Sequence, residues 1–427
     1  MDSRERFLQV VWRHGLFNSS LLETPEGEKI VIHDRGRENS GPGPDFLNAR
    51  LSIGPVLLAG DVEIHTEGNA WYSHGHHEDP AYAAVVLHVV GENPVITRCG
   101  TREIPVAAIG HLISESATAV YSTLLEETAA LPCARLLKTR AWPPDRIIIQ
   151  WHGSSAQRLR EKAQRLSILA RNARLTDATM AWFALLRALG FGVNAEPFQM
   201  LSLRLPWQLL ERHSDKPFTI TGLVFGMAGL IEKIQSPELR QKLQKEFDFF
   251  APDLDFPPLP IHVWRFGGTR PGNHPHRRLG LFLRWFLHLG PNLSEKFITV
   301  QSPAEFKKLL RSHPLPLPLD ENIPSGQLSP ASLETLIVNS VPPFLAYLSA
   351  KYDEARYFEQ AVAWLESLPP EQNRLTRLWQ GLGYAPSNAF ESQGIIELTH
   401  SLCRLKGCMR CSIGQALVKT SHPKPPL

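Results

Sequence analysis

The sequence predicts an N-terminal α/β domain followed by a mainly α-helical region. Three observations lead to this prediction: strand-like alternation between about residues 29 and 108, helical periodicity from about residue 140, and a concentration of glycine, acidic and histidine residues between 41 and 90. Strand side chains point alternately to two faces, whereas helix side chains return to one face about every 3.6 residues. The change of period therefore indicates a change of fold class along the chain.

Length and composition limit the classes of protein to consider. The chain has 427 residues, and a prior of about 150 residues per domain gives two or three domains. Its 43% hydrophobic and 20% charged residues exclude a disordered protein. It has no apolar run of the ~18 residues that a membrane span needs, and its start, MDSRERFLQVVWRHG, lacks the apolar core of a signal peptide. We therefore expect a cytoplasmic protein with no membrane partner.

The elements expected in the N-terminal domain follow the order helix, three strands, helix, strand. They are expected at residues 4–16, 29–34, 46–53, 56–65, 80–84 and 85–90, with one or two further strands between 94 and 108. Asp79 would cap the second helix, and Pro80 would occupy its first position. The last strand, VVLHVV, is continuously apolar, which is typical of a strand buried on both faces.

The domain boundaries are expected at residues 1–135 for the α/β domain and 140–427 for the helical region. Ser-Pro pairs, typical of helix starts, occur at Ser236, Ser302 and Ser329. The proline-rich segments 252–260 and 313–320 are expected to be stiff, extended linkers that subdivide the helical region.

Acidic and histidine residues meet on one strand of the N-terminal domain. Alternation places Asp61, Glu63 and His65 on the same face, while the residues between them point the other way. Asp45 follows the turn GPGP and begins the preceding strand. Two carboxylates and an imidazole aimed at one cleft could hold a divalent metal. The alternative is that Asp45 only caps a turn and that Glu63 and His65 lie on a solvated face.

This order of elements, with Pro-Asp before the second strand and Glu-x-basic on the third, resembles the PD-(D/E)xK nuclease superfamily over about a quarter of the chain. The resemblance implies a restriction-endonuclease-like fold in which Asp45 and Glu63 bind Mg²⁺ or Mn²⁺. His65 would replace the lysine that orients the attacking water, and Asp61 could assist. Such ions prefer oxygen ligands and keep waters that can act as nucleophiles.

The resemblance therefore implies a metal-dependent nuclease acting on DNA or RNA. A neutral imidazole lacks the permanent charge of lysine, so a catalytically inactive nucleic-acid- or protein-binding module of the same fold is the alternative. The net charge of +3 neither requires nor excludes a nucleic-acid partner, because binding depends on local patches.

Histidines around this strand offer a second use of the same residues. They are His65, His74, His76, His77 and His88. His74 with His76 or His77 could bind Zn²⁺ alongside Glu63, which would make a histidine-zinc hydrolase acting on a small molecule. His88, inside VVLHVV, is expected to be a hydrogen-bonded core residue.

The cysteines indicate a separate metal site. An odd number of cysteines without a signal peptide argues against a disulfide framework; they are Cys99, Cys133, Cys403, Cys408 and Cys411. The last three have the spacing C-x4-C-x2-C, and the fourth ligand would be Cys133 or, as a second choice, His400. Thiolate ligation does not by itself separate Zn²⁺ from [4Fe–4S]. Three reduced, buried thiols are the alternative.

Residues 264–278, WRFGGTRPGNHPHRR, form a basic Gly/Pro segment. Its arginines could bind phosphates through their guanidinium groups; they are Arg265, Arg270, Arg277 and Arg278. Trp264 and Phe266 could stack on bases. The alternative, which the pattern slightly favours, is a loop that covers helix ends.

Motifs over nearly the full length are similar to those of the bacterial domain of unknown function 2851 family. They are WRHGLF, GPGPDFLNARL, GDVEIH, W-x-x-H-x-H, LHVV, LPC, GFGVNAEPF and the terminal C-x4-C-x2-C-x-I-G. This resemblance implies a bacterial cytosolic protein and brings no established activity. Function must therefore be argued from the site residues.

Overall fold

The computed structural model of the chain describes residues 3–39, 41–127, 129–139, 142–268, 271–311 and 328–421. The chain divides into two compact units. Unit 1 comprises Met1–Gln150, Leu378–Tyr384 and Ile396–Leu427, and unit 2 comprises Trp151–Arg377 and Ala385–Ile395. The first segment of unit 1 thus ends at Gln150. The C-terminal cysteines belong to unit 1, because the chain returns to it after the helices of unit 2.

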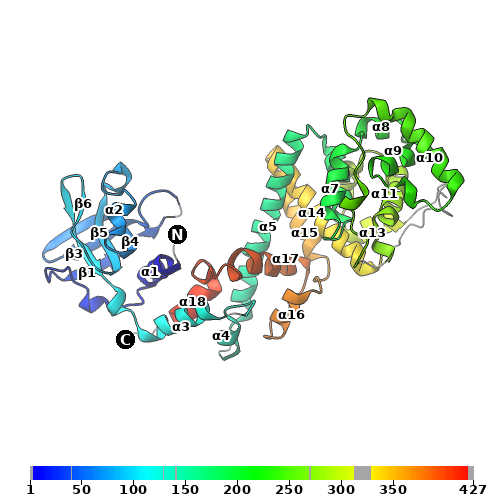
Figure 1. The fold of residues 1–427 in the computed structure, drawn as a ribbon. Coiled ribbons are helices and arrows are strands. Elements are labelled where there is room, and N and C mark those ends of the chain that lie inside the picture. The colour runs from blue at the N-terminus through cyan, green and yellow to red at the C-terminus, as the bar shows by residue number, and fades with distance from the viewer. Residues whose placement is uncertain are drawn as a thin grey trace. The chain divides into compact units, whose positions relative to one another are not determined.

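Unit 1 contains a mixed β-sheet (Figure 1). Its strands are β1 (Ile30–Asp34), β2 (Arg37–Glu38), β3 (Phe46–Ile53), β4 (Val56–Glu67), β5 (Val85–Glu92) and β8 (Val106–Ala108). The strand order is β1-β3-β4-β5-β8, and β2 pairs with β3. Strand β3 is antiparallel to β1 and β4, whereas β4, β5 and β8 run parallel. A separate hairpin joins β6 (Thr97–Cys99) and β7 (Arg102–Ile104).

The helices of unit 1 come from both ends of the sequence. They are α1 (Ser3–His14), α2 (Ala70–Ser73), α3 (Glu115–Glu126), α4 (Ala134–Thr139) and α18 (Ser412–Ser421), with parts of α5 (Pro144–Asn172), α16 (Arg374–Gln380) and α17 (Ala389–Leu398). Helices α1 and α2 pack on strand β4 of this sheet, and α18 packs on α3. Phe7 of α1 is buried and stacks on Tyr121 of α3, with ring centroids 4.1 Å apart. The predicted N-terminal helix and the strands before residue 92 are confirmed.

The helix predicted at 80–84 is shorter than expected. It is a single 3₁₀ turn, Pro80–Tyr82, in which Asp79 caps the Ala81 amide as predicted. The short helix α2 precedes it and was not predicted, because four residues carry too little periodicity to be recognised.

Unit 2 is helical. Besides its parts of α5, α16 and α17, it contains α6 (Asp177–Ala188), α7 (Ala195–Arg204), α8 (Trp207–Arg212), α9 (Pro217–Met227), α10 (Pro237–Phe250), α11 (Pro275–Leu289), α12 (Leu293–Thr299), α13 (Pro303–Arg311), α14 (Pro330–Tyr352) and α15 (Ala355–Glu366). The Oγ atoms of Ser236, Ser302 and Ser329 accept hydrogen bonds from the helix amides three residues later, so the predicted helix starts are confirmed. Within the described residues, each helix is too short or too polar to span a bilayer.

The segment 252–260 belongs to unit 2 and is mostly exposed, with Leu259 as its buried anchor. Leu259 is buried, and its amide donates to the Met227 carbonyl at 2.8 Å. A Cβ on Gly229 would lie 2.1 Å from the Leu259 carbonyl oxygen, which shows how closely the two segments approach. Leu259 therefore attaches the segment to the helices of unit 2, and its role as a linker between subdomains stays a prediction. The other predicted linker, 313–320, lies outside the described residues.

Candidate metal centre

Asp45 and Glu63 meet where β3 begins beside β4. The Asp45 amide donates to Glu63 Oε2 at 3.0 Å, and the Ile64 amide donates to Asp45 Oδ2 at 3.1 Å. Each carboxylate is thus oriented by the backbone of the strand that carries the other. The structure therefore brings together the two acidic residues that the sequence predicted as metal ligands.

Helix α1 contributes to the same cluster. Gln9 is 2% exposed, and its Nε2 donates to Asp45 Oδ1 at 2.7 Å. Arg6 Nη1 in turn donates to Gln9 Oε1 at 2.7 Å, which fixes the direction of the amide. Glu5 precedes Gln9 by one helical turn, and its charge acts on both carboxyl groups. Sequence reasoning missed these residues, although a polar Gln9 inside the apolar run of α1 indicated a buried partner.

Three histidines complete the cluster. Glu63 Oε1 lies 3.5 Å from His65 Nε2 and 3.4 Å from His76 Nε2. Ligand atoms of His65, His74 and His76 all lie within 4.8 Å of one another. His65 is 1% exposed and His76 is 12% exposed, whereas His74 is open to solvent. The cluster is therefore closed at His65 and accessible at His74.

A chain of hydrogen bonds behind His65 fixes which of its nitrogens carries a proton. Thr97 Oγ1 donates to the Val95 carbonyl at 3.1 Å and accepts from His88 Nδ1 at 3.0 Å. His88 Nε2 then carries a lone pair and accepts from His65 Nδ1 at 2.9 Å. His65 Nε2 is left with a lone pair that faces Glu63. His88 is fully buried and hydrogen-bonded, which confirms its prediction as a core residue.

Burial opposes charge throughout the cluster. It raises the pKa of Asp45 to about 8, with a further contribution from the neighbouring Glu63 charge. Burial also raises the pKa of Glu63 to about 8 and lowers the pKa of His88 to about 3. The pKa of His65 lies well below its ordinary value, mainly because of burial and then because of the neighbouring His88, His76 and His74. A cation would allow both carboxylates to ionise beside neutral imidazoles.

The loop that carries His74 and His76 is held by aromatic side chains. Trp71 is fully buried and donates from Nε1 to the Arg98 carbonyl at 2.9 Å. Tyr82 stacks on the His76 ring, with centroids 3.8 Å apart. Gly75 adopts φ +78°, a left-handed conformation that suits glycine in the turn between the two histidines. The sequence did not indicate that Trp71 and Tyr82 position this loop.

Asp61 and His77 have other partners. Asp61 Oδ1 accepts from the Asn48 amide at 3.0 Å. Asn48 adopts φ +60° at a point where the register between β3 and β4 shifts, so its amide leaves the strand ladder and the Asp61 carboxylate satisfies it. His77 lies 3.6 Å from Glu78. Strand alternation predicted that Asp61 lies beside Glu63. The register shift between β3 and β4 instead gives the Asp61 carboxylate a partner at the bulge.

The four cysteines of the predicted second site are all buried in unit 1. Cys133 lies close enough to Cys408 and Cys411 for their charges to interact, and Cys403 interacts with all three. Each of the four is 8% exposed. His400, the second choice for the fourth ligand, is exposed, and Cys99 packs instead beside Trp71.

The described residues of the basic segment 264–278 are partly buried in unit 2. Trp264 is buried and donates to the Ala228 carbonyl at 2.8 Å, so it is not available to stack on a base. Arg278 is 2% exposed and lies over the Phe191 ring. Arg265 is exposed, Arg277 is half-buried, and Arg270 lies outside the described residues. The alternative, a loop that packs over neighbouring elements, agrees with these contacts.

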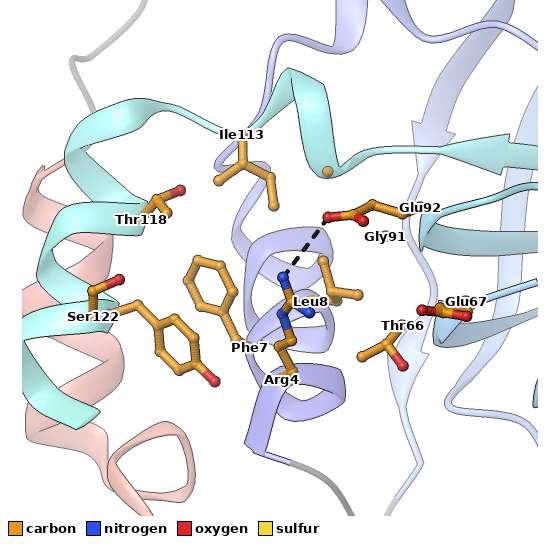
Figure 2. Close-up of a pocket in the computed structure, with 12 residues that line it drawn as sticks. Arg4, Phe7, Leu8, Thr66, Glu67, Gly91, Glu92, Ile113, Thr118 and Ser122 are labelled. Atoms are coloured by element: carbon orange, nitrogen blue, oxygen red, sulfur yellow. Dashed lines mark ion pairs between the residues drawn. The ribbon is translucent and has the colours of Figure 1, made fainter. Parts of the chain in front are cut away.

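A pocket of about 210 Å³ lies elsewhere in unit 1 (Figure 2). Figure 2 shows Leu8 of α1 toward the ends of β4 and β5 and Phe7 toward α3, with an ion pair between Arg4 and Glu92. None of the residues that line it belongs to the carboxylate–histidine cluster or to the cysteine site. Its lining combines apolar side chains of α1 and α3 with polar and charged ones, among them this exposed ion pair.

Comparison with known proteins gives one match. A model of the family described as "Protein of unknown function (DUF2851)" matches residues 5–374. The chain belongs to the DUF2851 family. The matched range includes the carboxylate–histidine cluster and Cys133, and it ends before Cys403. No curated protein and no solved structure matches the chain.

Proposed function

We propose that this DUF2851 protein is a divalent-metal-dependent hydrolase that cleaves phosphodiester bonds in nucleic acids. The observation that carries the proposal is the meeting of Asp45 and Glu63 with the lone pair of His65 Nε2. Paired carboxylates and an oriented imidazole form a donor set that binds a divalent ion. The histidine is oriented through its other nitrogen, as metal-binding histidines usually are.

The mixed donor set favours Mn²⁺ over Mg²⁺. Mg²⁺ prefers oxygen ligands in a strict octahedron, whereas imidazole suits later divalent metals. Three histidines lie with Glu63 here, so a purely oxygen-ligated ion would leave their nitrogens unused. Of the two ions expected from the sequence, Mn²⁺ therefore fits these residues better.

Nucleic acid is proposed as the substrate because of the placement of these residues in the fold. Helix α1, strands β1, β3 and β4, the short helix α2 and strand β5 follow the order that the PD-(D/E)xK resemblance implies. Asp45 directly precedes β3, and Glu63-x-His65 lies in β4, which are the positions where that resemblance puts its ligands. A restriction-endonuclease-like fold and a phosphodiester substrate are supported by this order together with the two motifs.

The buried residues of the cluster would bind the metal, and the exposed loop histidines would transfer protons. When bound, a divalent ion would polarise a phosphoryl oxygen and lower the pKa of a water molecule. Glu63 and His65 are buried, Asp45 is half-buried, and these three would hold it. His74 is exposed and could accept a proton from water, so we assign this task to the loop histidines in place of His65.

A second candidate is a zinc hydrolase acting on a small molecule. The grouping of His65, His74 and His76 favours it, because three neutral imidazoles are a common ligand set for catalytic Zn²⁺. In this case Glu63 would be the proton acceptor beside the ion.

The test is a cleavage assay with the full chain stripped of metal. Single-stranded DNA, duplex DNA and RNA are incubated separately with Mn²⁺, Mg²⁺ or Zn²⁺. We expect cleavage with Mn²⁺, and we expect Glu63→Gln to slow it by at least about 1000-fold, since loss of metal catalysis costs several kcal/mol at about 1.4 kcal/mol per tenfold. Glu67→Gln, which changes an exposed carboxylate on the same strand, is the matched control.

The outcomes separate the candidates. Cleavage at equal rates by the wild type and Glu63→Gln would show a contaminating nuclease and overturn the proposal. Hydrolysis of model esters with Zn²⁺, together with no cleavage of nucleic acid, would favour the zinc hydrolase. Binding of nucleic acid without cleavage under every metal would identify the inactive binding module.

A further inference from the structure

We propose that Cys133, Cys403, Cys408 and Cys411 bind a [4Fe–4S] cluster that cross-links the C-terminal segment to the rest of unit 1. The inference is independent of the proposed hydrolase activity, because it concerns a different set of residues. It rests on the convergence of four cysteines, on the backbone around them and on the spacing of their sulfur atoms.

The four cysteines come from two parts of the chain that are far apart in sequence. Cys133 lies in the turn between α3 and α4, and the other three lie between α17 and α18. They are buried together in unit 1, and none of the chain's five cysteines, all of which are described, forms a disulfide. Four buried, reduced thiols in one place match the ligand number of a [4Fe–4S] cluster.

The backbone around the triplet forms two tight turns. After Cys403, the Lys406 amide donates to the Cys403 carbonyl at 3.2 Å, and Lys406 adopts the left-handed φ of +55°. After Cys408, the Cys411 amide donates to the Cys408 carbonyl at 3.1 Å. The turns direct the three side chains into one region, which a continuous helix with this spacing would not do.

Backbone amides point at the sulfur of Cys411. The amides of Gly414 and Ile413 donate hydrogen bonds to it. A Cβ at Gly414 would lie 2.2 Å from the Cys408 carbonyl oxygen, so only glycine allows the chain to close around the sulfur in this way. A thiol is a weak acceptor, whereas a metal-bound thiolate is a charged one, and such hydrogen bonds to cysteine sulfur tune iron–sulfur clusters.

A positive charge also lies beside this site. Lys406 interacts electrostatically with Cys408. Its Nζ is buried and, in the part of the chain that the structure describes, has no hydrogen-bond partner. A buried ammonium group is costly without an anion, and a cluster held by four thiolates would provide negative charge at this point.

The spacing of the sulfur atoms favours an iron–sulfur cluster over zinc. A tetrahedral Zn²⁺ with Zn–S bonds of about 2.3 Å brings its four sulfurs to about 3.8 Å from one another. Among the described residues, the histidine trio is the group of three or more ligand atoms found this close, within 4.8 Å, so no three of the cysteine sulfurs all lie within 4.8 Å of one another. A cluster with several iron atoms between its ligands requires this wider arrangement.

The consequence is structural. Helix α18 packs on α3, and the Ser412 amide and hydroxyl at its start both donate to Gln150 Oε1, at 2.9 and 2.7 Å. These are few polar contacts for a segment that follows about 270 residues after Cys133. The cluster would hold the C-terminal segment against the rest of unit 1 through covalent metal–sulfur bonds.

The test is metal analysis of the full chain purified without oxygen. We expect about four iron and four acid-labile sulfide per chain, with a broad visible absorption that bleaches on reduction. Cys411→Ser should lose the iron and the absorption, and Cys99→Ser, which changes the one cysteine outside the group, should retain both. The wild-type measurement needs no variant, so a Cys411→Ser protein that fails to fold leaves the test intact.

Three results would overturn the assignment. One tightly bound zinc per chain and no iron, under anaerobic conditions and after reconstitution with iron and sulfide, would show a zinc site. Neither metal in the wild type would show that the four thiols bind none. Full iron content in Cys411→Ser would place the iron elsewhere.

Discussion

The carboxylate–histidine cluster and the cysteine group lie in the same unit, yet their residues come from the chain in opposite ways. Asp45, Glu63, His65, His74 and His76 lie within 32 consecutive residues, whereas 270 residues separate Cys133 from Cys403. The first site is built on a sheet and one loop, and it is open at His74. The second is made of tight turns whose four sulfurs are all buried.

This difference indicates different roles. A local site on a rigid strand can be complete before the rest of the chain is in place, and its open side admits a substrate. A site whose ligands are far apart in sequence closes a long loop, so binding there contributes mainly to stability. We therefore assign chemistry to the first and cross-linking to the second, and each prediction below tests that division.

The largest expected effect is on stability at the cysteine group. Cys411→Ser should lower the midpoint of thermal unfolding of unit 1 by about 10 °C, because losing roughly 4 kcal/mol of metal-coupled folding energy shifts it by about 2–4 °C per kcal/mol. Glu63→Gln should shift it by less than about 2 °C. Circular dichroism melting of both variants beside Cys99→Ser checks the contrast, and equal shifts for all three would contradict it.

The sequence predicted the strands better than the cluster built on them. Apolar alternation located β3 and β4, because burying one face of a sheet requires that pattern. It also paired Asp45 with Glu63, which β3 and β4 bring together as neighbouring strands. It could not show Gln9 meeting Asp45, since the direction of a helical side chain depends on how α1 packs on the sheet.

The loop histidines and the arginines show a second limit. Choosing between His76 and His77 needs the conformation of a short turn, which Gly75 and the ring of Tyr82 fix in the folded state. The basic segment 264–278 appeared suited to phosphate, but charge in a sequence does not reveal burial, and Arg278 is buried. The spacing of the cysteines predicted a shared site, and the four are buried in unit 1, but the sequence could not show how their turns bring them there.

A smaller effect is expected from the relay behind His65. Thr97→Val removes the hydroxyl that accepts from His88 Nδ1, so the tautomer that leaves His65 Nε2 with a lone pair is no longer favoured. We expect Mn²⁺ to bind about 10–100-fold more weakly, as measured by isothermal titration calorimetry on the metal-stripped protein. Thr66→Val on β4 controls for the loss of a hydroxyl, and equal affinity in Thr97→Val would show that the relay does not orient a ligand.

The smallest effect is expected from Asp61, which shares a strand with Glu63 but has a different hydrogen-bond partner. Asp61 lies two residues before Glu63, but it binds the Asn48 amide at the bulge. Asp61→Ala should therefore cost about 1 kcal/mol in urea unfolding, the value of one partly exposed hydrogen bond, and should leave Mn²⁺ affinity unchanged. Glu67→Ala, an exposed carboxylate on the same strand, should be neutral in both measurements. If Asp61→Ala weakened Mn²⁺ binding as Glu63→Gln does, Asp61 would belong to the metal centre and the face predicted by strand alternation would extend through the bulge.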